Sequence, residues 1–263
     1  MPVKLTPEQR RVATRFSRLV RDFSGEALAM EIGVAAQQAF GEPHFAQLLI
    51  QLQLKHVEMS KALIASFRAG LFAPAAGLTR PLLEGAAKLS WAAIARPEER
   101  RARLLRILVT AYIELEEEGV ALPPGELALR EEAARLNLGP APDARSAMQA
   151  VDALARRLEL PPFLEDHYQQ FGLSSQQLHV HLAGPAVFAV DRERQEMVIY
   201  VEPRVLLGFS SLRWAIYYFA FATQSIAMLV GLDDLRARIV RRYNAIVGEA
   251  EAEVARLTAA GQP

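Results

Sequence analysis

Apolar residues recur every three or four positions along most of the chain, which is the period of an amphipathic helix. The first such stripe runs from Val12 to Phe23. Thr6 precedes it as a helix N-cap, and Pro7 suits the first helical position, where the backbone N–H has no helical acceptor in any case. We therefore expect a helix that begins at Pro7 and breaks at Ser24–Gly25.

Proline and glycine divide the following apolar stripes into further helices. These are expected over residues 26–40, 43–70, 74–96 and 97–119. Residues 120–145 are rich in proline and glycine and are expected to hold one short helix at the surface. Residues 143–160 form an amphipathic helix that Pro161 and Pro162 end.

The hydrophobic period changes after this helix. The segments AVFAV and EMVIYV flank the polar stretch DRERQ, which predicts a small β-hairpin near residues 186–201. Two long helices, at about 204–231 and 233–259, follow it.

The predicted fold class is mainly α, a multi-helix, bundle-like single domain over residues 1–263 with that one hairpin. Its parts are an N-terminal helical region (1–40), long helices (43–119), peripheral helices (120–160), and a histidine-containing segment with the hairpin and two last helices (161–263).

The penultimate helix is apolar enough to raise the question of a membrane. From Trp214 to Leu232 the chain has 19 residues without a charge, which is the length of a membrane span. Thr223, Gln224 and Ser225 interrupt this stretch at its centre, and no second comparable span occurs. A helix that is apolar on all sides also suits the middle of a large helical core, so we expect a buried helix and no membrane contact.

The charges balance, with 30 basic and 30 acidic residues, so the whole chain is not drawn to nucleic acid or to an anionic membrane. The arginines of the first helix, which we call the arginine run, lie mainly on its polar side and are expected to be a solvated face: Arg10, Arg11, Arg15, Arg18 and Arg21. The sequence thus carries no strong nucleic-acid signal. It has no cysteine and opens without an apolar signal segment, which predicts a cytoplasmic protein.

Three of the five histidines lie in HYQQFGLSSQQLHVHLAG, residues 167–184. His179 and His181 are two residues apart and would point to different sides of a helix, so they could not share a metal ion there. Ser175 and His179 would be neighbours on a helix, where a local hydrogen bond is more common than a hydrolase dyad. No histidine pair at i,i+4, no G-x-S-x-G elbow and no phosphate-binding glycine loop occurs. We expect neither a metal nor a cofactor.

Arg80, Glu84 and Lys88 are spaced one turn apart in an otherwise apolar helix. Such a charge ladder is either a solvated stripe or a partly buried polar network, because buried charges need partners. A buried network of this kind either supports the fold or forms part of a site.

The chain resembles the DUF5677 family of uncharacterised, mostly bacterial helical proteins. The resemblance rests on R-x-x-x-E, here Arg80 and Glu84, and on Y-x(6)-S-x-x-x-H, here Tyr168, Ser175 and His179. It covers roughly residues 45–235 and implies that these five residues meet in the folded protein. HEPN-type ribonucleases are a more distant analogy, but their R-x(4–6)-H motif is absent before His179, which argues against ribonuclease activity.

Three functions remain open. The favoured one is a non-catalytic binding or interaction module, possible as a homo-oligomer, with a polar pocket formed by Arg80, Glu84, Tyr168, Ser175 and His179. An alternative is a hydrolase acting on phosphodiesters with the same residues. The third is a polar network that only supports the fold. Neither the ligand nor a protein partner follows from the sequence.

Overall fold

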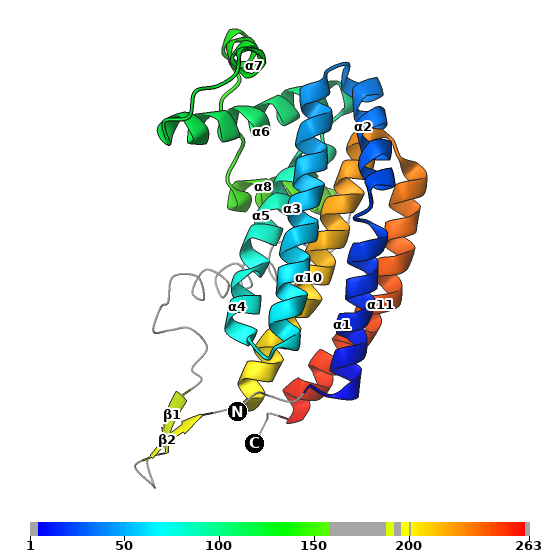
Figure 1. Cartoon of the computed structure of the whole chain (residues 1–263), viewed down its shortest axis with the longest axis vertical. Coiled ribbons are helices and arrows are strands. Elements are labelled where there is room, and N and C mark those ends of the chain that lie inside the picture. Colours follow the sequence, from blue (N-terminus) through cyan, green and yellow to red (C-terminus); the bar gives the residue numbers. More distant parts are fainter. Residues whose placement is uncertain (1–4, 158–187, 192–195, 200, 261–263) are drawn as a thin grey trace.

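Two long antiparallel helices form the centre of the protein, for which the computed structural model describes residues 5–157, 188–191, 196–199 and 201–260. They are α3 (Pro43–Arg68) and α10 (Val201–Val230). Near one end Phe67 packs against Phe209, with 5.9 Å between ring centroids, and further along Thr223 donates a hydrogen bond to Gln53 at 3.2 Å. Figure 1 shows these two helices with the helices of residues 72–93 on one side and those of residues 7–40 and 233–260 on the other.

The first helix begins as predicted. In α1 (Pro7–Asp22) the Thr6 hydroxyl accepts a hydrogen bond from the Gln9 backbone N–H at 3.2 Å, and the Gln9 side chain accepts one from the Thr6 N–H at 3.0 Å. This reciprocal pair satisfies two N–H groups that a bare helix end leaves without acceptors. The predicted break at Ser24–Gly25 is also confirmed, since α2 (Glu26–Phe40) begins directly after it.

The last helix, α11 (Asp233–Ala260), packs between α10 and α1. Its Glu253 carboxylate accepts hydrogen bonds from the side chains of Thr6 and Gln9, which joins the end of α11 to the cap of α1. Glu249, one turn earlier, pairs with Arg15 of α1. The two ends of the described chain are thus held together by polar contacts around a buried carboxylate.

The predicted helix over residues 74–96 is wrong in its bounds. The structure has two helices instead, α4 (Phe72–Gly77) and α5 (Thr79–Ala93). Pro81 explains the break, because it has no N–H to donate to the carbonyl of Gly77 four residues earlier. At the other end Arg96 is extended, with φ −57° and ψ 147°, as expected for a residue that precedes a proline.

The next three helices are α6 (Pro97–Glu117), α7 (Pro124–Arg135) and α8 (Ala144–Arg157). Figure 1 shows α6 and α7 extending away from the bundle at the upper left, while α8 lies against α5. The predicted helix ends at Gly70 and Gly119 are confirmed, since both glycines have a positive φ of 74° and 79° and close their helices with left-handed turns.

Two four-residue strands, β1 (Phe188–Asp191) and β2 (Glu196–Ile199), pair antiparallel with Phe188 opposite Ile199. The residues that connect them lie outside the described residues, so the hairpin near 186–201 stays a prediction. Two strands of this length add nothing to the fold class, and the predicted mainly helical class is confirmed.

Buried hydrophobic side chains from all the described helices, α1 to α8, α10 and α11, belong to one connected core. At the centre of α10, Thr223 and Ser225 face this core and are buried. Among the described residues, no helix is both long enough and apolar enough to cross a membrane.

Candidate functional site

Arg80 and Glu84 form an ion pair on α5, with 2.8 Å between Nε and Oε1. Their side chains keep 26% and 38% of their surface exposed, so the pair is half-buried rather than sealed in the core. Lys88, one turn further along, is also half-buried. The charge ladder predicted from the sequence is therefore present, and its position at the edge of the core is compatible with a structural role or a site.

The other three members of the predicted polar set, Tyr168, Ser175 and His179, lie outside the described residues. The same holds for His167 and His181. The convergence of Arg80 and Glu84 with these side chains stays a prediction.

A buried histidine, His56 of α3, lies at the contact between α3 and α5. Its side chain is 1% exposed, with Nδ1 2.7 Å from the Leu52 carbonyl oxygen and Nε2 3.2 Å from the Leu82 carbonyl oxygen. A neutral imidazole has one N–H and donates to only one of these carbonyls. Protonation would supply the second donor, but burial disfavours the charged ring and lowers the pKa of His56. The ring is therefore neutral and packs as a core side chain.

Glycine at position 85 makes room for that ring. A Cβ atom placed on Gly85 would lie 2.5 Å from Cε1 of His56, which is closer than carbon atoms approach each other without repulsion. Gly85 thus allows α5 to pack closely on α3 at the level of the Arg80–Glu84 pair.

Hydrogen bonds of buried polar side chains also connect α3 with α10 and α5 with α10. Gln53 of α3 donates to the Phe23 carbonyl at 3.0 Å and accepts from Thr223 of α10. Ser90 of α5 and Ser225 of α10 lie 3.0 Å apart between their hydroxyl oxygens. These groups have partners and serve helix packing, so they leave no open site inside the core.

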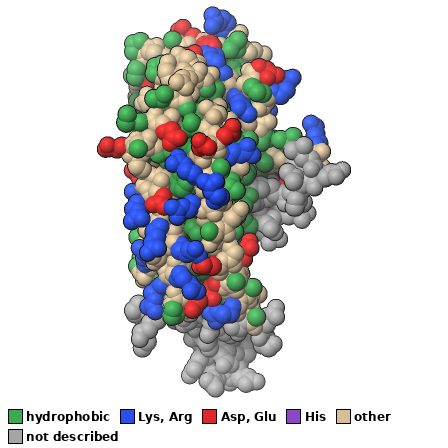
Figure 2. Space-filling view, turned by 90° about the vertical axis from the view of Figure 1, so that its right-hand side faces the viewer, with side chains coloured by type: hydrophobic (Ala, Val, Ile, Leu, Met, Phe, Trp, Pro, Cys, Tyr) green, Lys and Arg blue, Asp and Glu red, His purple; other side chains and the backbone are tan. Residues whose placement is uncertain are grey.

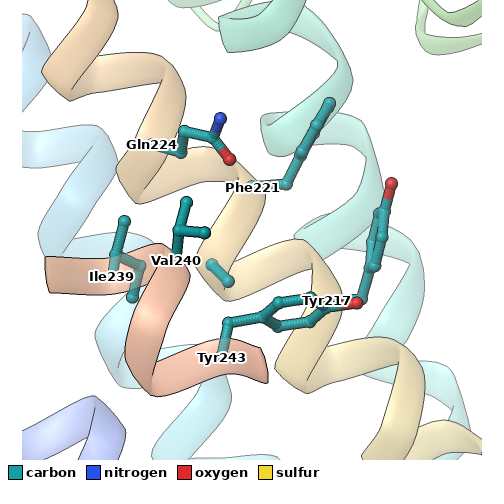
Figure 3. A pocket seen from close by; sticks show the side chains of 7 residues that line it. Tyr217, Phe221, Gln224, Ile239, Val240 and Tyr243 are labelled. Atoms are coloured by element: carbon teal, nitrogen blue, oxygen red, sulfur yellow. The ribbon is translucent and has the colours of Figure 1, made fainter. Parts of the chain in front are cut away.

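A cavity of about 180 Å³ lies between α10 and α11. Tyr217, Ala220, Phe221 and Gln224 line it from α10, and Ile239, Val240 and Tyr243 line it from α11. Figure 3 shows the two sets of side chains on either side of it. The spacing of three and four residues on each helix places each set on one helical face.

The aromatic rings of the cavity support one another. The rings of Tyr217 and Phe221 are stacked with centroids 5.5 Å apart, and Tyr243 meets Tyr217 edge to face at 5.9 Å. Such contacts stabilise a ring pair by about 0.5–1.5 kcal/mol beyond its buried area. The wall of the cavity is therefore held in place before any ligand enters.

The tyrosine hydroxyls of the cavity remain protonated. Burial raises the pKa of Tyr243 to about 12, and the nearby Glu251 adds to the rise while Arg213 opposes it. Burial also raises the pKa of Tyr217, with a further contribution from Tyr243. The Tyr243 phenol can donate a hydrogen bond to a ligand, and neither phenol is a base at neutral pH.

No cluster of three or more histidine, aspartate or glutamate side chains within the described ranges could hold a metal ion. Comparison of the chain with family models, with curated proteins and with solved structures found no match. The resemblance to the DUF5677 family therefore stays a prediction.

The α10–α11 cavity was not predicted from the sequence. Its signal is present in the interrupted apolar stretch, where Tyr217, Phe221 and Gln224 recur on one helical face. In the sequence alone, the polar residues there serve only as evidence against a membrane span. The structure separates them, since Thr223 and Ser225 point into the core and Gln224 lines the cavity.

Proposed function

We propose that the protein is a non-catalytic binding protein that holds a small ring-shaped molecule in the cavity between α10 and α11. The size and lining of the cavity carry this proposal. Apolar cavities of about 150 Å³ admit benzene, and this one has about 180 Å³. It has room for a single ring, whereas a drug-sized ligand needs about 300 Å³ or more.

The polar groups of the lining indicate what the ring would carry. Tyr243 offers a protonated hydroxyl, and the Gln224 amide offers both donors and an acceptor. The apolar remainder, with Phe221 and Val240, favours an uncharged ring face. The ligand class is a neutral aromatic or heteroaromatic ring with one or two hydrogen-bonding substituents.

Thermal unfolding in the presence of phenols, indoles and small heteroaromatic compounds tests the proposal. A ligand at ten times its Kd stabilises the folded protein by about 1.4 kcal/mol, which raises the Tm of a domain of this size by about 3–6 °C. The variant Ala220→Leu fills the cavity with three carbons and should retain or raise the Tm of the free protein.

The matched control is Ala237→Leu, which adds the same carbons on the exposed side of α11. We expect hits to raise the Tm of the wild type and of Ala237→Leu but not of Ala220→Leu. Equal shifts in all three proteins, or no hit for the wild type, would contradict the proposal.

A second candidate is the phosphodiester hydrolase, which would use Arg80 and Glu84 with Tyr168, Ser175 and His179. The half-buried Arg80–Glu84 ion pair favours it, because a guanidinium oriented by a carboxylate can bind a phosphate group. Hydrolysis of bis(p-nitrophenyl) phosphate by the wild type, lost in Arg80→Ala, would support it.

The thermal midpoint of Arg80→Ala separates this hydrolase from the structural alternative. A half-exposed pair contributes at most about 1 kcal/mol, so the Tm should fall by less than about 4 °C. Arg96→Ala, which breaks an exposed pair with Glu99, is the control. A much larger fall in Arg80→Ala alone, without hydrolysis by the wild type, would identify a structural network.

A further inference from the structure

The arginine run of α1 is continued past the end of that helix by arginines of α11, which the sequence could not reveal. Arg238, Arg241 and Arg242 lie where α11 passes the end of α1 and the first half of α2, since Arg242 reaches Asp22 at 3.4 Å and Arg238 reaches Glu31 at 3.3 Å. We call the arginine run together with these three residues the arginine face. Figure 2 shows basic side chains gathered on this side of the molecule.

The carboxylates on the arginine face are fewer than its arginines. Arg11 and Arg15 share Glu249, Arg21 and Arg242 share Asp22, and Arg238 pairs with Glu31. Arg10, Arg18 and Arg241 have no carboxylate within 4.0 Å among the described residues. The face therefore has a clear excess of positive charge, although the net charge of the whole chain is zero.

We infer that the arginine face binds the phosphate backbone of double-stranded nucleic acid. The guanidinium group pairs with phosphate through two parallel hydrogen bonds, and arginine supplies every basic residue of the face. From Arg11 to Arg21 the arginine run extends about 15 Å along α1. One strand of a duplex presents four or five phosphates over that length, at about one per 3.4 Å.

The surroundings of the face distinguish a duplex from other polyanions. Single strands are held by aromatic side chains on which bases stack, and no aromatic residue belongs to the arginine face. Peripheral membrane binding inserts large apolar side chains beside the basic ones. In the described part of the chain, no exposed large hydrophobic residue lies on α1 or α11, and the nearest ones are Met30 and Val34 of α2, which flank Glu31, the partner of Arg238. This inference is independent of the proposed cavity ligand.

Fluorescence anisotropy with a labelled 20-base-pair DNA duplex tests the inference on the full-length chain. The test variant is Arg10→Gln/Arg18→Gln/Arg241→Gln, which removes three exposed charges and breaks no ion pair of the described residues. The control is Arg96→Gln/Arg135→Gln/Arg157→Gln, which removes the same charge from exposed positions near α6, α7 and α8.

We expect the wild type and the control to bind the duplex at about 50 mM salt, and the test variant to bind at least tenfold more weakly. The slope of log K against log salt should become shallower by about 3 in the test variant only, since each lost phosphate contact contributes about 0.9. Single-stranded DNA of the same length should bind more weakly than the duplex.

Four results would each overturn the inference. They are no binding to duplex DNA or duplex RNA at low salt, equal losses in the test and control variants, stronger binding to vesicles containing phosphatidylserine, and a salt-dependent self-association that accounts for the anisotropy change. Sedimentation of the protein alone over the same salt range distinguishes the last case.

Discussion

His56 and Gly85 show how a single contact constrains two residues. The imidazole lies in the space that a larger residue at position 85 would occupy, and its pKa is lowered by burial. Neither property follows from the sequence. The close contact and the lowered pKa each predict the effect of a single substitution.

The substitution Gly85→Ala should destabilise the protein by up to about 2 kcal/mol in total. The added Cβ would lie 2.5 Å from the His56 ring, and overpacking of this kind costs about 1–3 kcal/mol in well-packed cores. The cost should exceed the gain of about 1 kcal/mol that alanine brings in helix propensity. Chemical denaturation measures it.

Gly248→Ala in α11 is the control, because a Cβ there meets nothing within 4 Å. It should stabilise the protein by about 0.5–1 kcal/mol. If both glycine substitutions change stability in the same direction and by the same amount, the described contact between α3 and α5 is wrong.

Stability should decrease as the pH falls below about 6.5, because of His56. The unfolded chain binds a proton at His56 near the ordinary pKa of 6.5, whereas the folded chain, with its lowered pKa, binds it only at more acidic pH. Between the two pKa values the unfolded state holds one more proton, so the free energy of unfolding falls by at most about 1.4 kcal/mol per pH unit.

Denaturation midpoints of the wild type and of His56→Gln between pH 7 and pH 5 measure this effect. Glutamine removes the titrating group and retains an N–H donor for a carbonyl. The variant should lose less stability on acidification than the wild type does. Parallel pH profiles for the two proteins would show that the buried imidazole does not cause the acid sensitivity.

At the scale of helices, sequence patterns predicted most boundaries because the signals there are local. A cap at Thr6 and a left-handed glycine at Gly70 act on residues only a few positions away. The break between α4 and α5 was missed because the apolar stripe continues across it, and Pro81 alone signals the missing hydrogen bond. Pairing between helices, such as Ser90 with Ser225, depends on residues far apart in sequence and could not be predicted.

Gln53→Leu tests how strongly buried polar groups join the helices. Gln53 donates to the Phe23 carbonyl at the end of α1 and accepts from Thr223 of α10. Leucine would leave that carbonyl without its donor, which costs about 1–3 kcal/mol. Thr223 would keep its other hydrogen bond, to the Phe219 carbonyl at 3.0 Å.

Thermal unfolding should therefore show a fall of at least about 2 °C in the Tm of Gln53→Leu, at about 2–4 °C per kcal/mol. Gln51→Leu, an exposed glutamine two residues away, should change the Tm by less than about 2 °C. An unchanged Tm in Gln53→Leu would mean that these hydrogen bonds contribute nothing net to helix packing.

At the scale of the molecule, composition predicts neither where the charges lie nor that a cavity is present. A net charge of zero does not reveal that arginines from both ends of the described chain lie on one side, because α11 returns along α1. The cavity likewise needs Tyr217 of α10 and Tyr243 of α11 to face each other. The polar set around Arg80 was predicted from short motifs, and the structure places only its Arg80–Glu84 part.

A crystal structure of the protein soaked in phenol would show whether the space between α10 and α11 is a ligand site. We expect electron density for one ring in contact with Phe221 and Val240, with its hydroxyl within hydrogen-bonding distance of Gln224 or Tyr243, and no such density in soaked crystals of Ala220→Leu. A soaked wild-type crystal with the cavity empty, or with the ring bound only elsewhere, would mean that the cavity is not a ligand site.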